Sequence, residues 1–144
     1  MDGKIEDGGR ALVQLKDYGF EISMARYLRE KGKEVIVARG RDNNADATPA
    51  EIIGLRGLIG NLNWATREGM PQGAGEASIL ASSLPTPKVK DLREANAAYR
   101  RLLATADTPV PIRPIPLKRL VLVTFTDSSL ANCLLYTSPS PRDQ

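Results

Sequence analysis

Asp127 is the carboxylate that the sequence places directly after its most strand-like run, residues 120–126. A carboxylate at a strand end suits a magnesium ion, because oxygen ligands are what the ion prefers and the strand fixes their position. Magnesium-dependent hydrolysis of phosphodiesters usually uses several carboxylates around two ions. The chain contains no adjacent Asp pair. From spacing alone, an ordinary residue at a strand-to-turn junction is therefore the simpler interpretation of Asp127.

The residue types that the sequence lacks exclude several chemistries. The chain of 144 residues contains no His and one Cys. Without His there is no serine–histidine triad, no Cys–His dyad and no His-ligated metal. A single Cys forms neither an internal disulfide nor a zinc cluster. No apolar run approaches the roughly 20 residues of a membrane span, and the amino-terminal residues do not resemble a signal peptide. We therefore expect an intracellular chain that is neither secreted nor in a membrane.

Basic residues gather in the middle of the chain. Residues 1–47 are neutral overall, with nine Lys/Arg and nine Asp/Glu, whereas residues 48–132 carry the whole net charge of +3. Cations on one helix face can contact phosphates, and each contact adds salt-sensitive affinity. Asp91 and Glu94 lie among these cations, so a solvated helix face is the simpler interpretation from sequence alone. The candidate nucleic-acid-binding residues are Lys88, Lys90, Arg93, Arg100 and Arg101.

Two glycine-rich stretches have the composition of phosphate loops without their spacing. Residues 54–60 (GLRGLIG) lack the Gly-Lys-Ser/Thr of a Walker loop and the G-x-G-x-x-G fingerprint, and they lie inside a helical period. Glycines within a helix cost roughly 1 kcal/mol each relative to Ala. We therefore expect these glycines to allow close packing against a neighbouring element. Residues 69–75 (GMPQGAG) are interpreted as a turn and a helix entry.

The elements that position these residues are predicted to form an α+β fold with three main helices, at about 49–67, 72–83 and 87–105. Thr48 caps the first, Pro49 takes its first position and Glu51 completes a capping box. Thr86-Pro87 repeats this device before the third helix. The predicted apolar positions of the first helix are Ile52, Ile53, Leu55, Leu58, Ile59, Leu62 and Ala65, and those of the third are Val89, Leu92, Asn96, Tyr99 and Leu103.

Short strands are predicted towards both ends of the chain. Gly8-Gly9 is a turn signal between strands at 4–6 and 11–15. A short helix at 23–31, a strand at 34–37 and a loop at 39–47 follow. Four prolines between residues 109 and 116 favour an extended segment at a sheet edge. The β-branched run before Asp127 predicts a C-terminal strand at about 119–126.

The last twelve residues, 133–144 (CLLYTSPSPRDQ), differ from everything before them. They hold the only Cys and follow the predicted strand without turn residues. The first eleven of them can be back-translated into consecutive codons of a transposase-based sequencing-library adapter. We therefore interpret residues 133–144 as a translated adapter and exclude them from functional argument. The alternative is a genuine Ser/Pro-rich tail.

Several motifs, taken in order, resemble the Pol polyprotein of copia-type LTR retrotransposons, in the segment that joins the reverse transcriptase to its RNase H domain. The resemblance covers residues 48–132. One departure is the family's Arg-Pro-Asp turn, which is 67–72 (REGMPQ) here, with an insertion and with Gln72 in place of Asp. The matching stretches are 58–67 (LIGNLNWATR), 77–80 (ASIL), 92–102 (LREANAAYRRL) and 126–129 (TDSS).

The resemblance implies a division of the chain into four parts. Residues 1–47 would be a variable strand and loop segment, and 48–107 a helical segment like the reverse transcriptase thumb or connection. Residues 108–132 would be the first strands of an incomplete RNase H-like domain, and 133–144 the adapter. Asp127 would correspond to the first magnesium-binding, catalytic carboxylate of RNase H. The polymerase carboxylates and the other RNase H carboxylates of the family would lie outside this sequence.

The resemblance predicts a fragment of an RNA-directed DNA polymerase with ribonuclease H activity, catalytically incomplete as given. In the parent, magnesium would be the cofactor. The partners would be an RNA/DNA template–primer duplex and the remainder of the polyprotein, in a cytoplasmic particle or the nucleus. We expect no cofactor for this chain alone. Two alternatives stay open from the residues: a small basic nucleic-acid-binding helical module, and an inert structural fragment.

Overall fold

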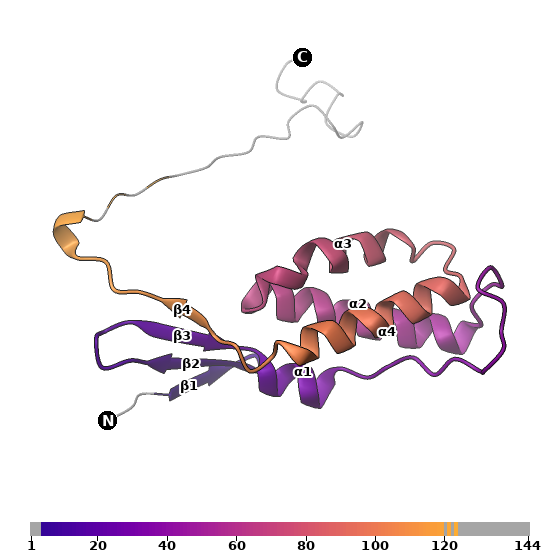
Figure 1. Ribbon diagram of the computed structural model, residues 1–144, viewed down its shortest axis with the longest axis horizontal. Coiled ribbons are helices and arrows are strands. Elements are labelled where there is room, and N and C mark those ends of the chain that lie inside the picture. The colour runs from indigo at the N-terminus through magenta and orange to yellow at the C-terminus, as the bar shows by residue number, and fades with distance from the viewer. Residues whose placement is uncertain (1–3, 120, 122, 124–144) are drawn as a thin grey trace, which may run out of the picture. The chain divides into compact units, whose positions relative to one another are not determined.

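The computed structural model describes residues 4–119, 121 and 123, which contain both helices and strands, so the predicted α+β class is confirmed. The chain divides into two units after Pro114. The first unit holds every α-helix and strand of the described residues (Figure 1). The second contributes one 3₁₀ turn, Leu117–Arg119. The helices are α1 (Ala25–Lys31), α2 (Pro49–Glu68), the 3₁₀ turn η1 (Pro71–Gly73), α3 (Ala74–Ser82) and α4 (Val89–Ala104).

Four short strands form one antiparallel sheet in the order β1-β2-β3-β4. The Gly8-Gly9 turn is confirmed, since both glycines have positive φ angles of 56° and 82° between β1 and β2. The proline-rich segment supplies the edge strand β4, as predicted. Strand β3 was not predicted, because its alternation of Phe20 and Ile22 with Glu21 and Ser23 covers only four residues. The strands are β1 (Lys4–Asp7), β2 (Arg10–Gln14), β3 (Phe20–Ser23) and β4 (Val110–Ile112).

One face of this sheet is mainly apolar, and its polar members are Asp7, Arg10 and Gln14. The pairing register places Ile5, Leu12, Ile22 and Val110 side by side, and a second row contains Phe20 opposite Ile112. Paired residues of antiparallel strands share a face, and so do residues two apart on one strand. No residue of β2, β3 or β4 is buried. The sheet therefore presents a mainly apolar face that the described residues leave partly uncovered.

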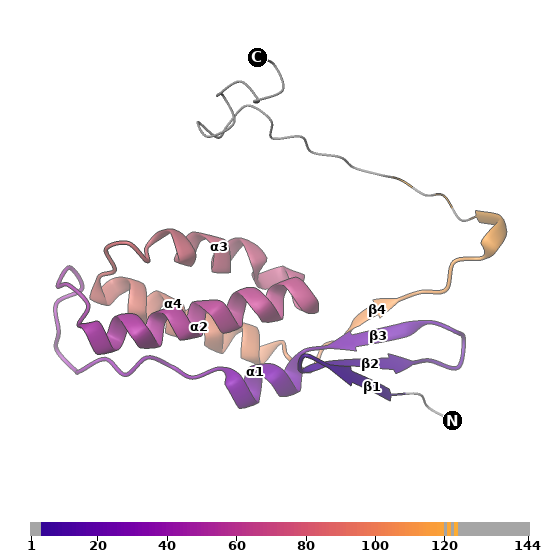
Figure 2. The same cartoon turned by 180° about the vertical axis from the view of Figure 1, so that it is seen from behind.

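The hydrophobic core lies between the helices. The predicted period of α2 is confirmed at Leu55, Leu58, Ile59 and Leu62, all nearly inaccessible to solvent. Ile53 was expected to widen this stripe, but it is 72% exposed, because its position faces away from the other helices. Figure 2 shows α2, α3 and α4 running alongside one another. Among the described residues, no helix is long and apolar enough to cross a membrane.

The start of α2 follows the predicted capping box. The Thr48 hydroxyl accepts from the Glu51 N–H at 3.3 Å, and the Glu51 carboxylate accepts from the Thr48 N–H at 2.8 Å. These bonds satisfy amide groups that the first turn leaves without helical partners. Pro49 occupies the first helical position, where no N–H is needed. The helix ends at Glu68, one residue beyond the prediction.

The start of α4 differs from the prediction. Lys88 rather than Thr86 is the N-cap, and its N–H donates to the Asp91 carboxylate at 2.7 Å. The Pro87 carbonyl is engaged elsewhere, because it accepts from the Ala47 N–H at 3.0 Å. The loop before α2 thus pairs with the residues before α4, and this tertiary contact delays the helix. Within α4, Leu102 is buried and Leu103 only half-buried, so the end of the core seam is shifted by one residue.

The predicted strand at 34–37 is not formed, and buried side chains of α4 hold this segment instead. The Asn96 side-chain amide donates to the Val35 carbonyl and accepts from the Val35 N–H, both at 2.8 Å. The Tyr99 hydroxyl contacts the carbonyls of Leu28 and Gly32 at 3.3 and 3.2 Å. Asn96 therefore replaces the neighbouring strand that the sequence pattern anticipated.

Most of the predicted C-terminal strand lies outside the described residues. Arg119, its first residue, ends a 3₁₀ turn, and Val121 and Val123 have no regular structure. The strand therefore stays a prediction over the remainder of 119–126.

The glycines of α2 do not all serve close packing. A Cβ at Gly54 would meet Val35 at 3.5 Å, which is ordinary contact, and a Cβ at Gly57 or Gly60 would meet nothing within 4 Å. The expected close approach is therefore wrong for Gly57 and Gly60, which lie on the exposed side of the helix. Gly73 does require the absence of a side chain, since a Cβ there would lie 2.9 Å from carbons of Leu102 and Thr66.

Replacing Gly57 or Gly60 by Ala is expected to raise the free energy of unfolding by about 1 kcal/mol each, because the helix gains propensity without a clash. Urea denaturation of the purified chain measures the change. Gly73→Ala is the control and should lower stability through its contacts with Leu102 and Thr66. A destabilised Gly57→Ala would mean that another surface covers this side of α2.

Asn96→Ala is expected to lower the free energy of unfolding by about 2 kcal/mol or more, because it leaves two backbone groups of Val35 without partners. Chemical denaturation followed by circular dichroism measures this loss. Asn63→Ala, on the exposed side of α2, is the matched control and should change stability little. Equal effects of the two substitutions would show that Asn96 does not hold the segment.

Candidate nucleic-acid interface

The basic residues predicted on the third helix belong to α4 and its N-cap. Lys88 is the N-cap residue, and Lys90, Arg93, Arg100 and Arg101 are exposed along the helix. The opposite side carries Leu92, Asn96 and Tyr99 and is buried in the core. The amphipathic division of this helix between a polar and a core-facing side is thus as predicted. The structure adds the partners of each cation, which the sequence did not indicate.

Arg100 makes the best-defined ion pair on this face. Its guanidinium donates to both carboxylate oxygens of Glu34, from Nε at 2.9 Å and from Nη2 at 2.7 Å. These hydrogen bonds lower the pKa of Glu34 and raise that of Arg100, because each ion stabilises the charged form of the other. Glu34 precedes the residue that Asn96 binds, so the pair links α4 to the same segment. Arg100 is therefore already engaged within the protein.

Lys88 and Arg93 contact the loop before α2. Lys88 Nζ lies 2.5 Å from the Asp46 carboxylate, and this hydrogen bond lowers the pKa of Asp46. Arg93 donates to the Asn43 side chain and, at 3.0 Å, to the Arg41 carbonyl. Both cations therefore hold residues 41–46 against the amino-terminal half of α4.

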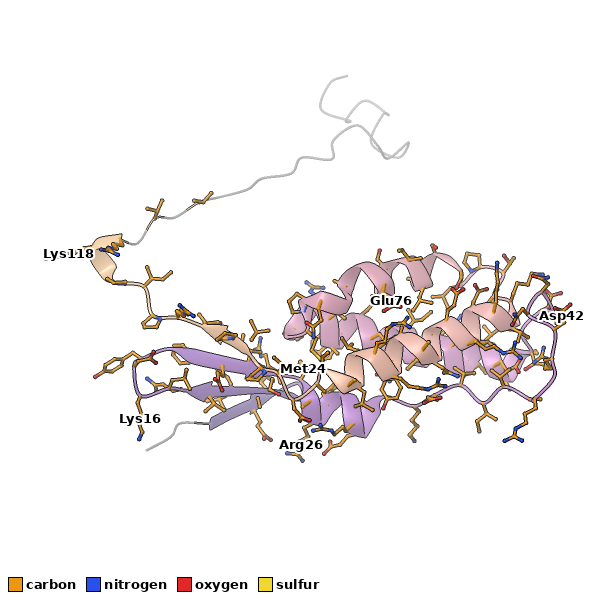
Figure 3. The ribbon with its side chains drawn as sticks, viewed as in Figure 1. Lys16, Met24, Arg26, Asp42, Glu76 and Lys118 are labelled. Carbon is orange, nitrogen blue, oxygen red and sulfur yellow. The ribbon has the colours of Figure 1, made fainter. Side chains whose placement is uncertain are left out.

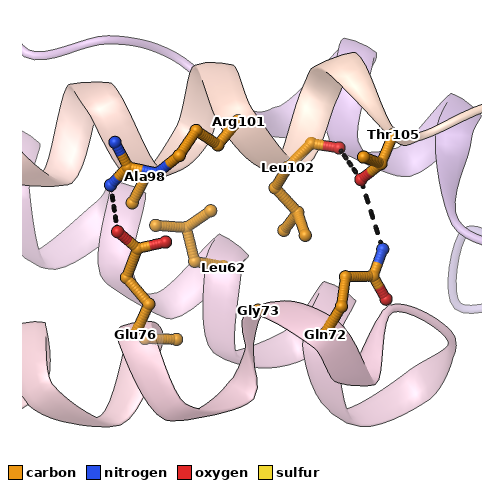
Figure 4. Close-up of a pocket in the computed structure, with 9 residues that line it drawn as sticks. Leu62, Gln72, Gly73, Glu76, Ala98, Arg101, Leu102 and Thr105 are labelled. Carbon is orange, nitrogen blue, oxygen red and sulfur yellow. Dashed lines mark hydrogen bonds and ion pairs between the residues drawn. The ribbon is translucent and has the colours of Figure 1, made fainter.

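Arg101 pairs with Glu76 of α3 across the opening of a pocket. Gln72 donates to the Thr105 hydroxyl at 3.2 Å at another side of this pocket (Figure 4). The cavity has a volume of about 200 Å³, and Leu62, Ala77, Ala98 and Leu102 give it an apolar lining. The two polar bridges connect α4 to α3 and η1, so Arg101 is also engaged within the protein.

Lys90 is the cation of this set whose side-chain ammonium has no hydrogen-bond or ion-pair partner among residues 4–119, although its backbone N–H donates to the Asn43 carbonyl at 3.0 Å. It lies near the amino-terminal end of α4, with Lys88 and Arg93 one helical turn or less away. Four of the five residues thus lie on α4, with Lys88 at its N-cap, and all except Lys90 have side-chain partners within the protein. The carboxylates Glu34, Asp46 and Glu76 were not predicted as part of this surface. Their separations of 66, 42 and 25 residues from their partners leave no local sequence signal.

The metal-binding candidate, Asp127, lies outside the described residues. Within the part of the chain that the structure describes, no group of three or more Asp, Glu, Cys or His side chains could hold a metal ion. The assignment of magnesium to Asp127 therefore rests on the family resemblance and stays a prediction.

Comparisons with protein-family models, with curated proteins and with solved structures gave no match to this chain.

Glu34→Gln is expected to strengthen binding to an RNA–DNA hybrid, because it releases the Arg100 guanidinium for a phosphate. The logarithm of the binding constant should then fall more steeply with the logarithm of salt concentration, by about 0.9 per added contact. Fluorescence anisotropy at several salt concentrations measures both effects.

Glu94→Gln is the matched control. It also removes one negative charge, at an exposed position of α4, but Glu94 has no ion pair with an arginine among the described residues. If the two variants bind the hybrid equally, Arg100 does not contact phosphate and the interface is not centred on this helix.

Proposed function

We propose that this chain is a segment of a copia-type reverse transcriptase and RNase H polyprotein that connects the two catalytic domains. The observation that carries the proposal is the order of the motifs between residues 48 and 132. Gly60–Trp64, the Ala-Ser-Ile-Leu stretch at 77–80, the basic helix and Asp127 follow one another as in that family. Each motif is short, and their common order gives the resemblance its specificity.

The positions of these motifs support a connecting role. The first three lie on α2, α3 and α4, which pack against one another around the core. Trp64, from the Gly-x-Leu-x-Trp motif, donates its indole N–H to the Gly8 carbonyl at 3.0 Å. Arg10 pairs with Glu68 at 3.1 Å beside this contact. The end of α2 is thereby joined to the first turn of the sheet, as suits a segment that positions its neighbours.

In the proposed parent, this segment contacts the template–primer duplex and carries no complete catalytic centre. Bound magnesium ions would supply the activation of water for RNA cleavage, with Asp127 as one of several carboxylate ligands. The cations of α4 would follow the phosphates of the duplex, with Lys90 as the first contact and the paired arginines exchanging a carboxylate for a phosphate. The remaining polymerase and RNase H carboxylates would come from the rest of the polyprotein.

A second candidate is a small nucleic-acid-binding module that acts without the polyprotein. Exposed cations without a partner among residues 4–119, such as Lys33, Arg56 and Lys90, favour it. Such a module would bind a duplex with an affinity that falls steeply with salt. A purely structural fragment would show no such binding.

We predict that the purified chain does not cleave an RNA–DNA hybrid in the presence of magnesium, because a single carboxylate does not hold two metal ions in place. Gel electrophoresis of a labelled hybrid measures cleavage. Cleavage that disappears in Asp127→Ala would contradict the prediction.

The nucleotide sequence on either side of the codons for residues 1–132 provides the direct test of the family assignment. We expect a Tyr-x-Asp-Asp segment encoded upstream and further RNase H carboxylates encoded downstream of Asn132. A continuous reading frame that contains neither would exclude the polyprotein.

A further inference from the structure

The turn between β2 and β3 holds a bulky residue in a conformation that favours glycine. The Leu15 N–H donates to the Gly19 carbonyl at 2.8 Å, and the Tyr18 N–H donates to the Leu15 carbonyl at 3.1 Å. Tyr18 has a φ of 65° and is the one non-glycine residue with positive φ in the described part of the chain. In hairpin turns of this kind the left-handed position is usually Gly or Asn. Tyr at this position therefore strains the turn.

The fold gives Tyr18 nothing that offsets this strain. Its side chain is 78% exposed, and its hydroxyl has no hydrogen-bond partner among residues 4–119. The turn is stabilised by another residue, because the Asp17 carboxylate accepts from the Gly19 N–H at 3.1 Å. A strained and exposed aromatic side chain that does not contribute to packing is a candidate binding residue.

Two exposed cations lie at the same end of the sheet as Tyr18. Lys16 belongs to the same turn, and Figure 3 shows it at the end of the sheet away from the helices. Arg113 follows β4, where Ile112 pairs with Phe20. The two strands are close here, because a Cβ at Gly19 would lie 2.9 Å from the Ile112 carbonyl oxygen. The antiparallel register thus places Arg113 opposite Gly19. Both cations are exposed and have no ion-pair partner among residues 4–119.

We propose that this tip cluster, Lys16, Tyr18 and Arg113, binds single-stranded nucleic acid. The Tyr18 ring stacks on an unpaired base, and Lys16 and Arg113 contact the phosphates on either side. Exposed aromatic rings among cations are how proteins hold single strands without sequence preference, because every base has a face for stacking. Paired bases inside a duplex offer no such face, so the cluster selects unpaired segments. The carboxylate of Asp17 is engaged by the turn backbone.

This site is separate from the cations of α4. It deepens the proposed nucleic-acid function by adding an unpaired strand as a ligand. The choice of nucleic acid as the ligand rests on that proposed function, whereas the tip cluster itself does not. A chain outside the polyprotein family could still have the tip cluster. Binding by the tip cluster can therefore be measured whatever sequence surrounds this reading frame.

The test uses the full chain and a fluorescein-labelled 20-nucleotide oligothymidine, with a blunt duplex of equal length as the second ligand. Tyr18→Gly should weaken binding to the single strand by about fivefold or more, which is the usual effect of removing one stacking side chain. Tyr18→Phe should bind as the unaltered chain does. Binding to the duplex should change little in either variant. Fluorescence anisotropy measures the affinity of each of the three proteins for both ligands.

Thermal unfolding separates binding from folding. Tyr18→Gly should unfold at the same or a higher temperature, because glycine adopts the positive φ without strain.

The two cations are tested by the salt dependence of binding. Substituting Lys16 and Arg113 together by Ala should reduce the slope of the logarithm of the single-strand binding constant against the logarithm of salt concentration by about 1.4. Lys33→Ala, which removes an exposed cation elsewhere, should not reproduce the effect of either tip cation.

Three results would overturn the proposal. The first is undiminished binding of the single strand by Tyr18→Gly, and the second is a clear fall in its unfolding temperature. The third is self-association of the unaltered chain that Tyr18→Gly abolishes in analytical ultracentrifugation, since the ring would then serve a protein contact.

Discussion

The side-chain amide of Asn96 is the interaction on which the arrangement of the first unit depends. It satisfies the N–H and the carbonyl of Val35 within the core, where water cannot replace it. Tyr99, one turn further along α4, contacts the carbonyls that end α1. Together these two side chains fix the connection between α1 and α2 on one side of α4. The connection then places Glu34 beside Arg100 and the loop at 41–46 beside the start of the helix.

The same arrangement decides what the basic residues of α4 can do. Exposed ion pairs contribute little to stability, because solvent screens them. They still occupy the guanidinium groups, and a phosphate must displace a carboxylate to bind Arg100 or Arg101. The strength of any duplex contact is thus set by competition between carboxylate and phosphate. Lys90 and the tip cluster have no such competitor within residues 4–119, which makes them the more accessible cations.

The sheet and the helical core differ in how they are supported. The core buries leucines of α2 and α4 almost completely, whereas no residue of β2, β3 or β4 is buried. The contacts of Trp64 with Gly8 and of Arg10 with Glu68 hold the sheet at one end. Its mainly apolar face and its strained turn extend beyond that support. The sheet is therefore less supported by the core than the helices are.

Local signals in the sequence were sufficient for the capping box of α2, its apolar period and the Gly8-Gly9 turn, because each depends on neighbouring residues. The sequence also indicated five cations on one helix. Only the tertiary structure decided that Glu34, Asp46 and Glu76 pair with three of them, since these contacts join residues distant in the chain. It likewise replaced the strand predicted at 34–37 by a segment bound to Asn96. Backbone hydrogen bonds require a partner, and the sequence could not show whether a strand or a buried amide would supply it.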